Sequence, residues 1–354
     1  MNSKINKLGY TSIIFFLTKP MFLHIGITEL LNSSLNNSIY SCFLGSIISL
    51  IILFLIIKIF NYEKDFNIFK KNEKLFYSGK IINLFLVLLF SLYLIYLLYS
   101  INAYIQNKYL DSTPSFIIIL LFIIPVIWCT SLNMKNISKV SISAFIVCIF
   151  VILFSFTNLV SSIDMDNIKP FFNTRIFTIL KDSIKFSGYF ITPVFLLLLT
   201  PKNKIDNINT KDIIIFYIIS SLYLIGLFIL IIGIFGIDLA KLFMYPEYTL
   251  MKKISYFDFI EHIENITTIE WFYTIFISSV LSLNFIKEYL IHINKYNKIL
   301  YFLIIFICFI SSLICFKNTT ISFNIVKNYY MYIFFIPILF LLIISNIKIK
   351  RNKF

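Results

Sequence analysis

Three ionisable side chains, Lys19, His24 and Glu29, lie within one long apolar segment that runs from Leu8 to Leu31. Because an ionisable group is costly inside a lipid bilayer, such residues indicate ligand binding or ion coupling. Lys19 lies mid-segment and is the best candidate to contact a ligand, whereas Glu29 lies near one end, where it could be solvated. His24 could equally be an ordinary interior histidine. Lys19 and Glu29 are separated by about 15 Å of helix, so we expect no direct pair between them.

The same segment is interrupted at Lys19-Pro20. Proline lacks a backbone amide hydrogen and Gly26 lowers helix propensity, so backbone groups near the break are predicted to be left unpaired. Such groups are tolerated at membrane depth only where they face protein or a water-filled cavity. Helix ends offer positive N-termini to a carboxylate and carbonyl oxygens to an ammonium group. The break therefore favours a small zwitterion as the ligand.

A second apolar segment, Ser183 to Pro201, is also interrupted. We predict that Gly188, Tyr189 and Pro193 form its break. Lys185 lies close to the outer boundary of this segment. It is a candidate for gating or coupling, and the alternative is that its ammonium group extends to the membrane surface.

Tyrosines on the third apolar segment provide further candidates, because Tyr93, Tyr96 and Tyr99 are spaced by three residues. They could line a pocket, although tyrosines at helical spacing also serve as packing residues. The predicted ligand-binding residues are Lys19, Pro20, His24, Gly26, Tyr96, Gly188, Tyr189 and Pro193.

The composition requires a membrane to hold these segments. Hydrophobic residues make up 59% of the 354-residue chain and charged residues only 14%, against about 25% charged in a soluble domain. Crossing a bilayer takes about 20 apolar residues. Besides the two interrupted segments, eight others qualify: Ser38–Ile57, Ile81–Asn107, Ser112–Met134, Val140–Ile163, Ile213–Ile237, Trp271–Ile286, Ile299–Phe316 and Asn328–Ile347. We therefore predict an all-α integral membrane protein with ten transmembrane helices in one domain, residues 1–354.

The distribution of basic residues predicts the orientation. With ten spans, 20 of the 31 Lys and Arg residues fall on the side of the two termini, nine fall on the other side, and Lys19 and Lys185 lie within spans. Basic loops face the cytoplasm, so both termini are predicted to be cytoplasmic. The net charge of +14 is explained by these loops facing anionic lipid, and we expect no nucleic-acid partner. A cleaved signal peptide is the alternative for the first segment.

No cofactor, metal or enzymatic chemistry is expected. The five cysteines form no CxxC pair, the three histidines are isolated, and P-loop, GxGxxG and HExxH patterns are absent from the sequence.

The interrupted segments are the first and the sixth, which are corresponding positions if the chain consists of two halves of five helices. Interrupted helices at matching positions are typical of five-plus-five inverted-repeat transporter folds, in which the breaks meet near the bilayer midplane. The pseudo-repeats would cover residues 8–163 and 164–347. The longest outer loop, residues 236–266, carries apolar residues at three- to four-residue intervals from Leu250 to Ile263, which predicts an amphipathic helix at the outer surface.

Three stretches resemble the GerAB/GerKB family of spore germination proteins, within the amino-acid/polyamine/organocation transporter (LeuT-like) superfamily. Tyr109 to Pro114 resembles the family's L-P-x-T-P motif, and Asp166 to Phe171 resembles its N-x-x-P motif. Tyr245-Pro246, followed by Phe259 to Glu264 and then Trp271, resembles a third motif. His262 stands where the family usually has arginine, and the first segment lacks the Leu-Pro that often follows its glycine.

The resemblance implies the B subunit of a spore nutrient-germinant receptor in the inner spore membrane. Such a subunit would work with an A subunit and a lipoprotein C subunit, would bind a small nutrient such as an amino acid, and would trigger germination without catalysing a reaction. The candidates for gating or coupling are Glu29, Lys185 and Glu264.

The alternative is an ion-coupled amino-acid transporter, and a third possibility is a scaffold or ion conduit for the A subunit. Coupling usually requires carboxylates within the membrane. Here only Glu29 lies well within a predicted span, with Glu270 and Glu288 at the ends of the eighth.

Overall fold

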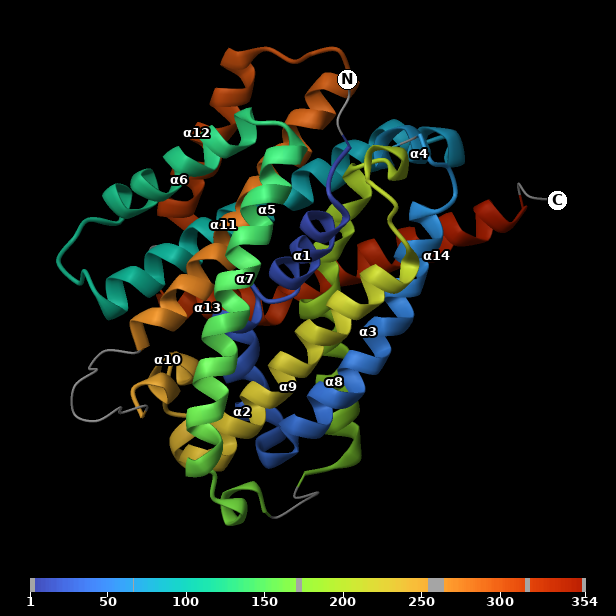
Figure 1. Ribbon diagram of the computed structural model, residues 1–354. Helices are drawn as coiled ribbons and strands as arrows, with labels where there is room; N and C mark the ends of the chain where they lie inside the picture. Colours follow the sequence, from blue (N-terminus) through green and yellow to red (C-terminus); the bar gives the residue numbers. More distant parts are fainter. Residues whose placement is uncertain (1–3, 66, 170–173, 254–263, 316–318, 352–354) are drawn as a thin grey trace.

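The computed structural model describes residues 4–65, 67–169, 174–253, 264–315 and 319–351, and these residues form helices (Figure 1). No sheet is present in these ranges, where β pairing is limited to one isolated bridge between Ile5 and Ile205. The all-α prediction is thereby confirmed.

The first predicted span is divided into two helical halves. Helix α1 (Lys7–Leu17) is followed by a non-helical turn, the π-helix η1 (Phe22–Gly26) and helix α2 (Ile27–Ser34). In the described part of the chain, the Lys19 and Met21 amides donate to no backbone carbonyl. The Gly26 amide donates a hydrogen bond to Met21 O at 2.8 Å. Pro20 has no amide hydrogen to continue α1. The break predicted at Lys19-Pro20 is confirmed.

The rest of the first half is regular. It comprises the 3₁₀ turn η2 (Leu35–Asn37), α3 (Ser38–Phe60), α4 (Ile68–Leu75), α5 (Gly79–Lys108), α6 (Ser115–Ser131), α7 (Met134–Leu159), and the 3₁₀ turns η3 (Val160–Ser162) and η4 (Met165–Ile168).

The second half begins with α8 (Ile176–Ile191), which runs directly into the 3₁₀-helix η5 (Thr192–Leu199). It continues with η6 (Lys202–Lys204), α9 (Thr210–Ala240), α10 (Pro246–Met251), α11 (Glu264–His292), α12 (Lys298–Cys315), α13 (Thr319–Tyr330), the π-helix η7 (Met331–Phe335) and α14 (Ile336–Arg351).

The position predicted for the second break was wrong at two of its three residues. Gly188 and Tyr189 lie in regular α-helix, and the change to 3₁₀ geometry comes at Thr192-Pro193. The reason is that Pro193 cannot donate a backbone hydrogen bond, whereas glycine is tolerated inside a helix. The predicted amphipathic helix from Leu250 to Ile263 falls largely outside the described residues, of which α10 ends at Met251.

Eight helical stretches in the described ranges are long and apolar enough to cross a membrane. The first and fourth predicted spans are carried by shorter apolar helices, the 11-residue α1 and the 17-residue α6. Pro20 explains the shortness of α1, and α6 begins only after Pro114. The number ten remains a prediction.

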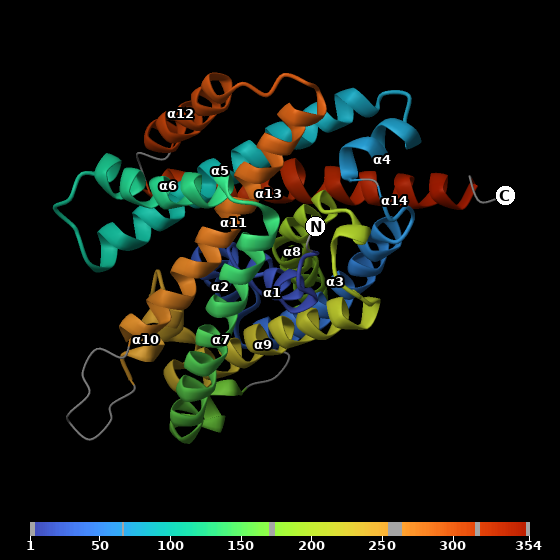
Figure 2. The ribbon, with the colours of Figure 1, turned by 45° about the horizontal axis from the view of Figure 1, so that its top comes forward.

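The interrupted first span lies in the interior. Every residue from Gly9 to Phe22 is buried, and α1 packs against α7, α9 and α11. Helix α3 packs along α8 on one side of the molecule, and α6 and α12 lie together on the other, as both views show (Figures 1 and 2). Large apolar side chains of α12, such as Phe302, Leu303 and Phe306, are exposed, as expected for a lipid-facing surface.

We predict that Gly45→Leu lowers the free energy of unfolding by about 1–3 kcal/mol through overpacking of the α3–α8 contact. A Cβ atom at Gly45 would lie 2.7 Å from the Ser183 carbonyl oxygen and 2.8 Å from Phe186 Cβ. Unfolding of the purified protein in detergent measures the effect. Ile47→Leu is the control, because Ile47 is 45% exposed on the same helix. A Gly45→Leu protein as stable as the wild type would contradict this packing.

Candidate functional site

The ammonium group of Lys19 lies at the break in the first span and is fully buried. It donates a hydrogen bond to Glu270 Oε1 of α11, with which it forms an ion pair. The ammonium nitrogen lies 3.3 Å from the centroid of the Phe15 ring. The second carboxylate oxygen, Glu270 Oε2, accepts from the Tyr223 hydroxyl of α9 at 2.9 Å. Three elements thus meet around one buried ion pair.

This arrangement stabilises both charges. A single buried charge would cost several kcal/mol, and removal of one partner of a buried pair is strongly destabilising. The aromatic ring adds a cation–π contribution to the Lys19 site. Glu270 was expected only to lie at the end of the eighth span, and a sequence separation of 251 residues gives no local pattern by which this pair could have been found.

A second buried cluster joins the two interrupted spans on the other side of the break. Lys185 Nζ of α8 lies 2.6 Å from Glu29 Oε1 and 3.7 Å from Asp182 Oδ1. The Tyr189 hydroxyl donates to Glu29 Oε2. Glu29 is 1% exposed, so the alternative of a solvated Glu29 is wrong. Lys185 is partly exposed, and its ammonium group is directed to Glu29 in this cluster.

Hydroxyl groups complete this second cluster. Ser33 Oγ donates to Asp182 Oδ2 at 2.5 Å, and Ser34 Oγ donates to the same oxygen. The two acids and one lysine are therefore surrounded by hydrogen-bond donors from α2 and α8.

The predicted site residues thus separate into groups. Lys19 and Pro20 form the break, Gly26 ends the π-helix that follows it, and Glu29, Lys185 and Tyr189 form the second cluster. As expected, Lys19 and Glu29 form no pair, since each has a different partner.

The other predicted residues are dispersed. Tyr96 is buried on α5, with its ring centroid 6.5 Å from that of Tyr99, and Pro193 is buried in η5. A Cβ atom on Gly188 would lie 2.6 Å from Met331 Sδ, so this glycine permits close packing against η7. The side chains of His24 and Glu264 fall outside the described part of the structure.

A carboxylate that the sequence analysis missed lies beside the Lys19–Glu270 pair. Glu247, in the first turn of α10, is 8% exposed. It faces a small cavity lined by Tyr104, Tyr223, Leu227, Glu247, Tyr248, Met251 and Glu270. The cavity offers about 20 Å³ to the centres of water-sized molecules, which is room for about one water.

Aromatic packing places Glu247 in this position. Pro246 begins α10, and the Trp271 ring lies with its centroid 4.3 Å from that of Tyr104 and 6.1 Å from that of Tyr245. The Tyr104 hydroxyl and Thr268 Oγ1 are hydrogen-bonded at 2.8 Å. The Tyr245-Pro246 and Trp271 elements of the third motif therefore pack together at the start of the helix that carries Glu247, and that motif is the signal that could have located it.

Burial raises the pKa of Glu247 to about 8, an effect that its own backbone amide and the charge of Lys108 partly offset. A carboxyl group with this pKa is protonated in much of the population near neutral pH.

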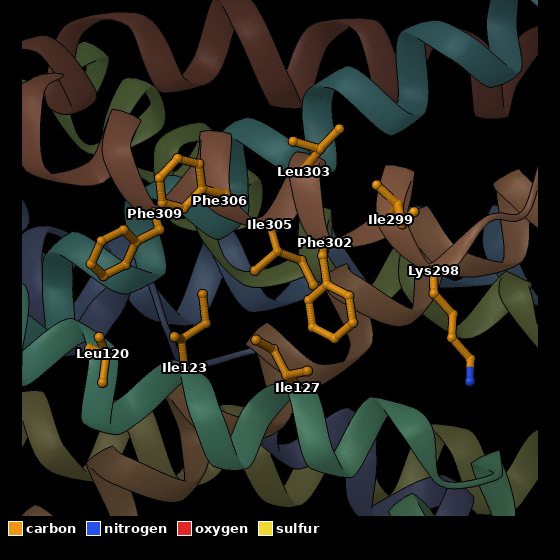
Figure 3. Close-up of a pocket in the computed structure, with 10 residues that line it drawn as sticks. All are labelled: Leu120, Ile123, Ile127, Lys298, Ile299, Phe302, Leu303, Ile305, Phe306 and Phe309. Carbon is orange, nitrogen blue, oxygen red and sulfur yellow. The ribbon is translucent and has the colours of Figure 1, made fainter.

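A separate apolar groove of about 730 Å³ lies between α6 and α12. Figure 3 shows Leu120, Ile123 and Ile127 of α6 facing the aromatic side chains of α12, with Lys298 at one end. Its lining contains few groups that could orient a zwitterion. We therefore place the candidate site at the break and not in this groove.

Comparison with known families decides the class of the protein. A model described as spore germination protein, spore permease, matches residues 10–324. The chain belongs to the spore germination protein family. The matched range contains the breaks of both interrupted segments, both charged clusters and α10. A search of curated proteins found no match. Within the described residues, no three His, Cys, Asp or Glu side chains are placed to hold a metal ion.

We predict that Lys19→Met lowers the free energy of unfolding by about 3–5 kcal/mol, because Glu270 is left buried without its cation. The double variant Lys19→Met/Glu270→Leu should lose less, since it buries no charge at this position. Denaturant titration of the purified proteins in mixed micelles measures both values. If Glu270→Leu lowered the stability of the Lys19→Met protein as much as it lowers that of the wild type, the two residues would not be coupled.

Glu247 should make stability depend on pH. Between pH 4.5 and about 8 the folded chain keeps a proton that the unfolded chain releases, so stability falls as pH rises through this window. The loss is at most about 5 kcal/mol. Melting temperatures from pH 5 to 9 in choline chloride should therefore fall for the wild type and fall less for Glu247→Gln.

Asp238→Asn is the matched control, because the Asp238 side chain is 92% exposed and its removal should leave the wild-type pH profile. A Glu247→Gln profile identical to that of the wild type would show that this carboxyl does not titrate in the window.

Proposed function

We propose that this protein is the B subunit of a nutrient-germinant receptor in the inner spore membrane. It binds a small germinant, an amino acid, in a transporter-like pocket at the break in the first span. The observation that carries this proposal is the buried Lys19–Glu270 ion pair, which lies beside backbone amides that donate to no carbonyl in the described part of the chain. Membership of the spore germination protein family supports the biological role.

An amino acid carries both charges of this ion pair. Its carboxylate can replace Glu270 as the partner of Lys19 and can accept hydrogen bonds from the backbone amides of Lys19 and Met21. Its ammonium group can replace Lys19 as the partner of Glu270. Exchange of partners leaves no charge unpaired, so the ligand can enter the pair at a moderate electrostatic cost.

The cavity beside the pair is smaller than an amino acid, so we propose that the pocket also has an open conformer and that the arrangement described here is its closed one. Binding then requires separation of Lys19 from Glu270, and the ligand stabilises the separated conformer. Receptor activation becomes a population shift driven by tighter binding to one state.

We further propose the ten-span arrangement with two inverted repeats of five helices, residues 8–163 and 164–347, and cytoplasmic termini. Contacts between corresponding helices of the two halves support it: α3 with α9, α5 with α11, and α6 with α12. Such pairing is expected around a pseudo-two-fold axis in the membrane plane. An A subunit and a lipoprotein C subunit are the proposed partners.

Spores that lack the gene, complemented with variants, test the proposal. Glu270→Gln keeps the shape of the side chain and removes its charge, so the amino-acid concentration for half-maximal germination should rise by about 10–100-fold. Lys19→Met should weaken the response at least as strongly. Germination is scored with each amino acid separately.

Glu63→Gln is the matched control, since Glu63 pairs with Lys74 at a partly exposed site and its removal should leave the dose response unchanged. Immunoblots of spore membranes establish that each variant accumulates. A wild-type dose response in both Lys19→Met and Glu270→Gln would refute the pocket, and amino-acid uptake driven by an ion gradient in proteoliposomes would favour a transporter instead.

A further inference from the structure

The carboxyl group of Glu247 has an unusual environment for a buried acid. Its Oε1 atom is buried and has no hydrogen-bond partner among the described residues. In the same ranges no lysine, arginine or histidine forms an ion pair with it. A buried acceptor without a donor costs free energy unless a ligand or ion compensates it.

When Glu247 is ionised, the charges around the cavity leave one negative charge without an ion-pair partner among the described residues. Glu247 comes from α10 and Glu270 from α11, while Tyr104 and Tyr223 reach the cavity from α5 and α9. Lys19 neutralises Glu270 from the side of the break.

Two further lysines lie near this site but are held on aromatic rings. Lys108 Nζ lies 5.3 and 4.8 Å from the ring centroids of Tyr245 and Tyr248, and Lys252 Nζ lies 5.2 Å from that of Tyr248. They provide positive potential near the cavity without donating to Glu247. With Glu247 ionised, the immediate site of Lys19, Glu247 and Glu270 carries one net negative charge.

We propose that this cavity binds one monovalent cation, held by the carboxylate oxygens of Glu247 and Glu270. The inference does not depend on the identity of the germinant. The volume fits a single occupant of water size. The polar lining consists of carboxylate and phenol oxygens, which are suitable ligands for a hard cation such as Na⁺ or K⁺ and for ammonium. A single positive charge makes the site neutral.

Other occupants fit less well. A divalent ion such as Ca²⁺ takes about six to eight oxygen ligands, more than this small cavity offers, and no group of three His, Cys, Asp or Glu in the described ranges could hold a metal ion. An amino acid exceeds the volume. A proton on Glu247 is the remaining competitor, and the experiment distinguishes it from a cation.

The bound cation would connect the outer surface to the proposed pocket. Glu270 belongs both to the ion pair at the break and to the cavity wall, and α10 packs on α11 and α9. A cation between Glu247 and Glu270 stabilises the contact of α10 with α9 and α11. It would therefore favour the closed conformer of the chain.

The test uses the full-length protein in lipid nanodiscs at pH 8.5, where protons compete least for the carboxylates. Choline chloride is replaced stepwise by NaCl, KCl or NH₄Cl at constant ionic strength, and the melting temperature is recorded. We expect a saturable rise on the order of 5 °C with at least one of the three salts. Glu247→Gln should abolish the saturable rise, and Asp238→Asn should retain it.

The second measurement is equilibrium dialysis of the wild-type protein with a radioactive isotope of the stabilising ion, or with labelled ammonium. It gives an answer even if Glu247→Gln folds poorly. About one ion bound per chain is expected. The absence of a saturable rise with all three salts, a rise retained in full by Glu247→Gln, or stabilisation by low pH without any bound cation would each overturn the proposal, the last by assigning the site to a proton.

Discussion

The burial of the Lys19 ammonium group between membrane-spanning helices is the constraint on which the centre of this protein depends. A buried charge requires a partner of opposite sign with its remaining hydrogen-bonding capacity satisfied. Glu270 provides the charge and Tyr223 satisfies its second oxygen. The end of α1 is therefore bound to one defined position on α11 and one on α9. In this way a single ion pair sets the relative placement of three helices from distant parts of the chain.

The two halves of the first span are held mainly by different partners. Helix α1 packs against α7, α9 and α11, whereas α2 packs chiefly against α3 and α8 and has a smaller contact with α9. The ion pairs follow the same division, since Lys19 pairs with α11 and Glu29 pairs with α8. The break at Pro20 is thus the joint between two differently anchored half-helices. The proposed ligand, which would replace the partner of Lys19, would act at this joint, where a small displacement requires no rupture of a continuous helix.

Local chemistry explains what could be predicted from the sequence. Proline has no amide hydrogen in any context, so the helix irregularities at Pro20 and Pro193 follow from residue type. The role of Gly188 does not follow from the sequence. A glycine that weakens a helix cannot be told in sequence from one that leaves room for a neighbouring side chain, here Met331. The Lys19–Glu270 pair could not be predicted, because its choice of partner depends on tertiary packing. Similarly, the Tyr245-Pro246 motif supported only the family resemblance, because the burial of Glu247 depends on tertiary packing with residues such as Tyr104 and Tyr223 from other helices.

The two charged clusters have the same composition and different consequences. Each contains two acids and one lysine: Glu29, Asp182 and Lys185 in one, Glu247, Glu270 and Lys19 in the other. In the first, hydroxyls of Ser33, Ser34 and Tyr189 donate to the two carboxylates, and Lys185 contacts both acids.

In the second cluster Lys19 reaches only Glu270, and Glu247 Oε1 has no donor among the described residues. The number of charges therefore does not distinguish a structural site from a binding site. The unsatisfied oxygen does, because of these two clusters only the one with Glu247 has a carboxylate oxygen for which an added ion would supply the partner that hydroxyl groups supply in the Glu29 cluster.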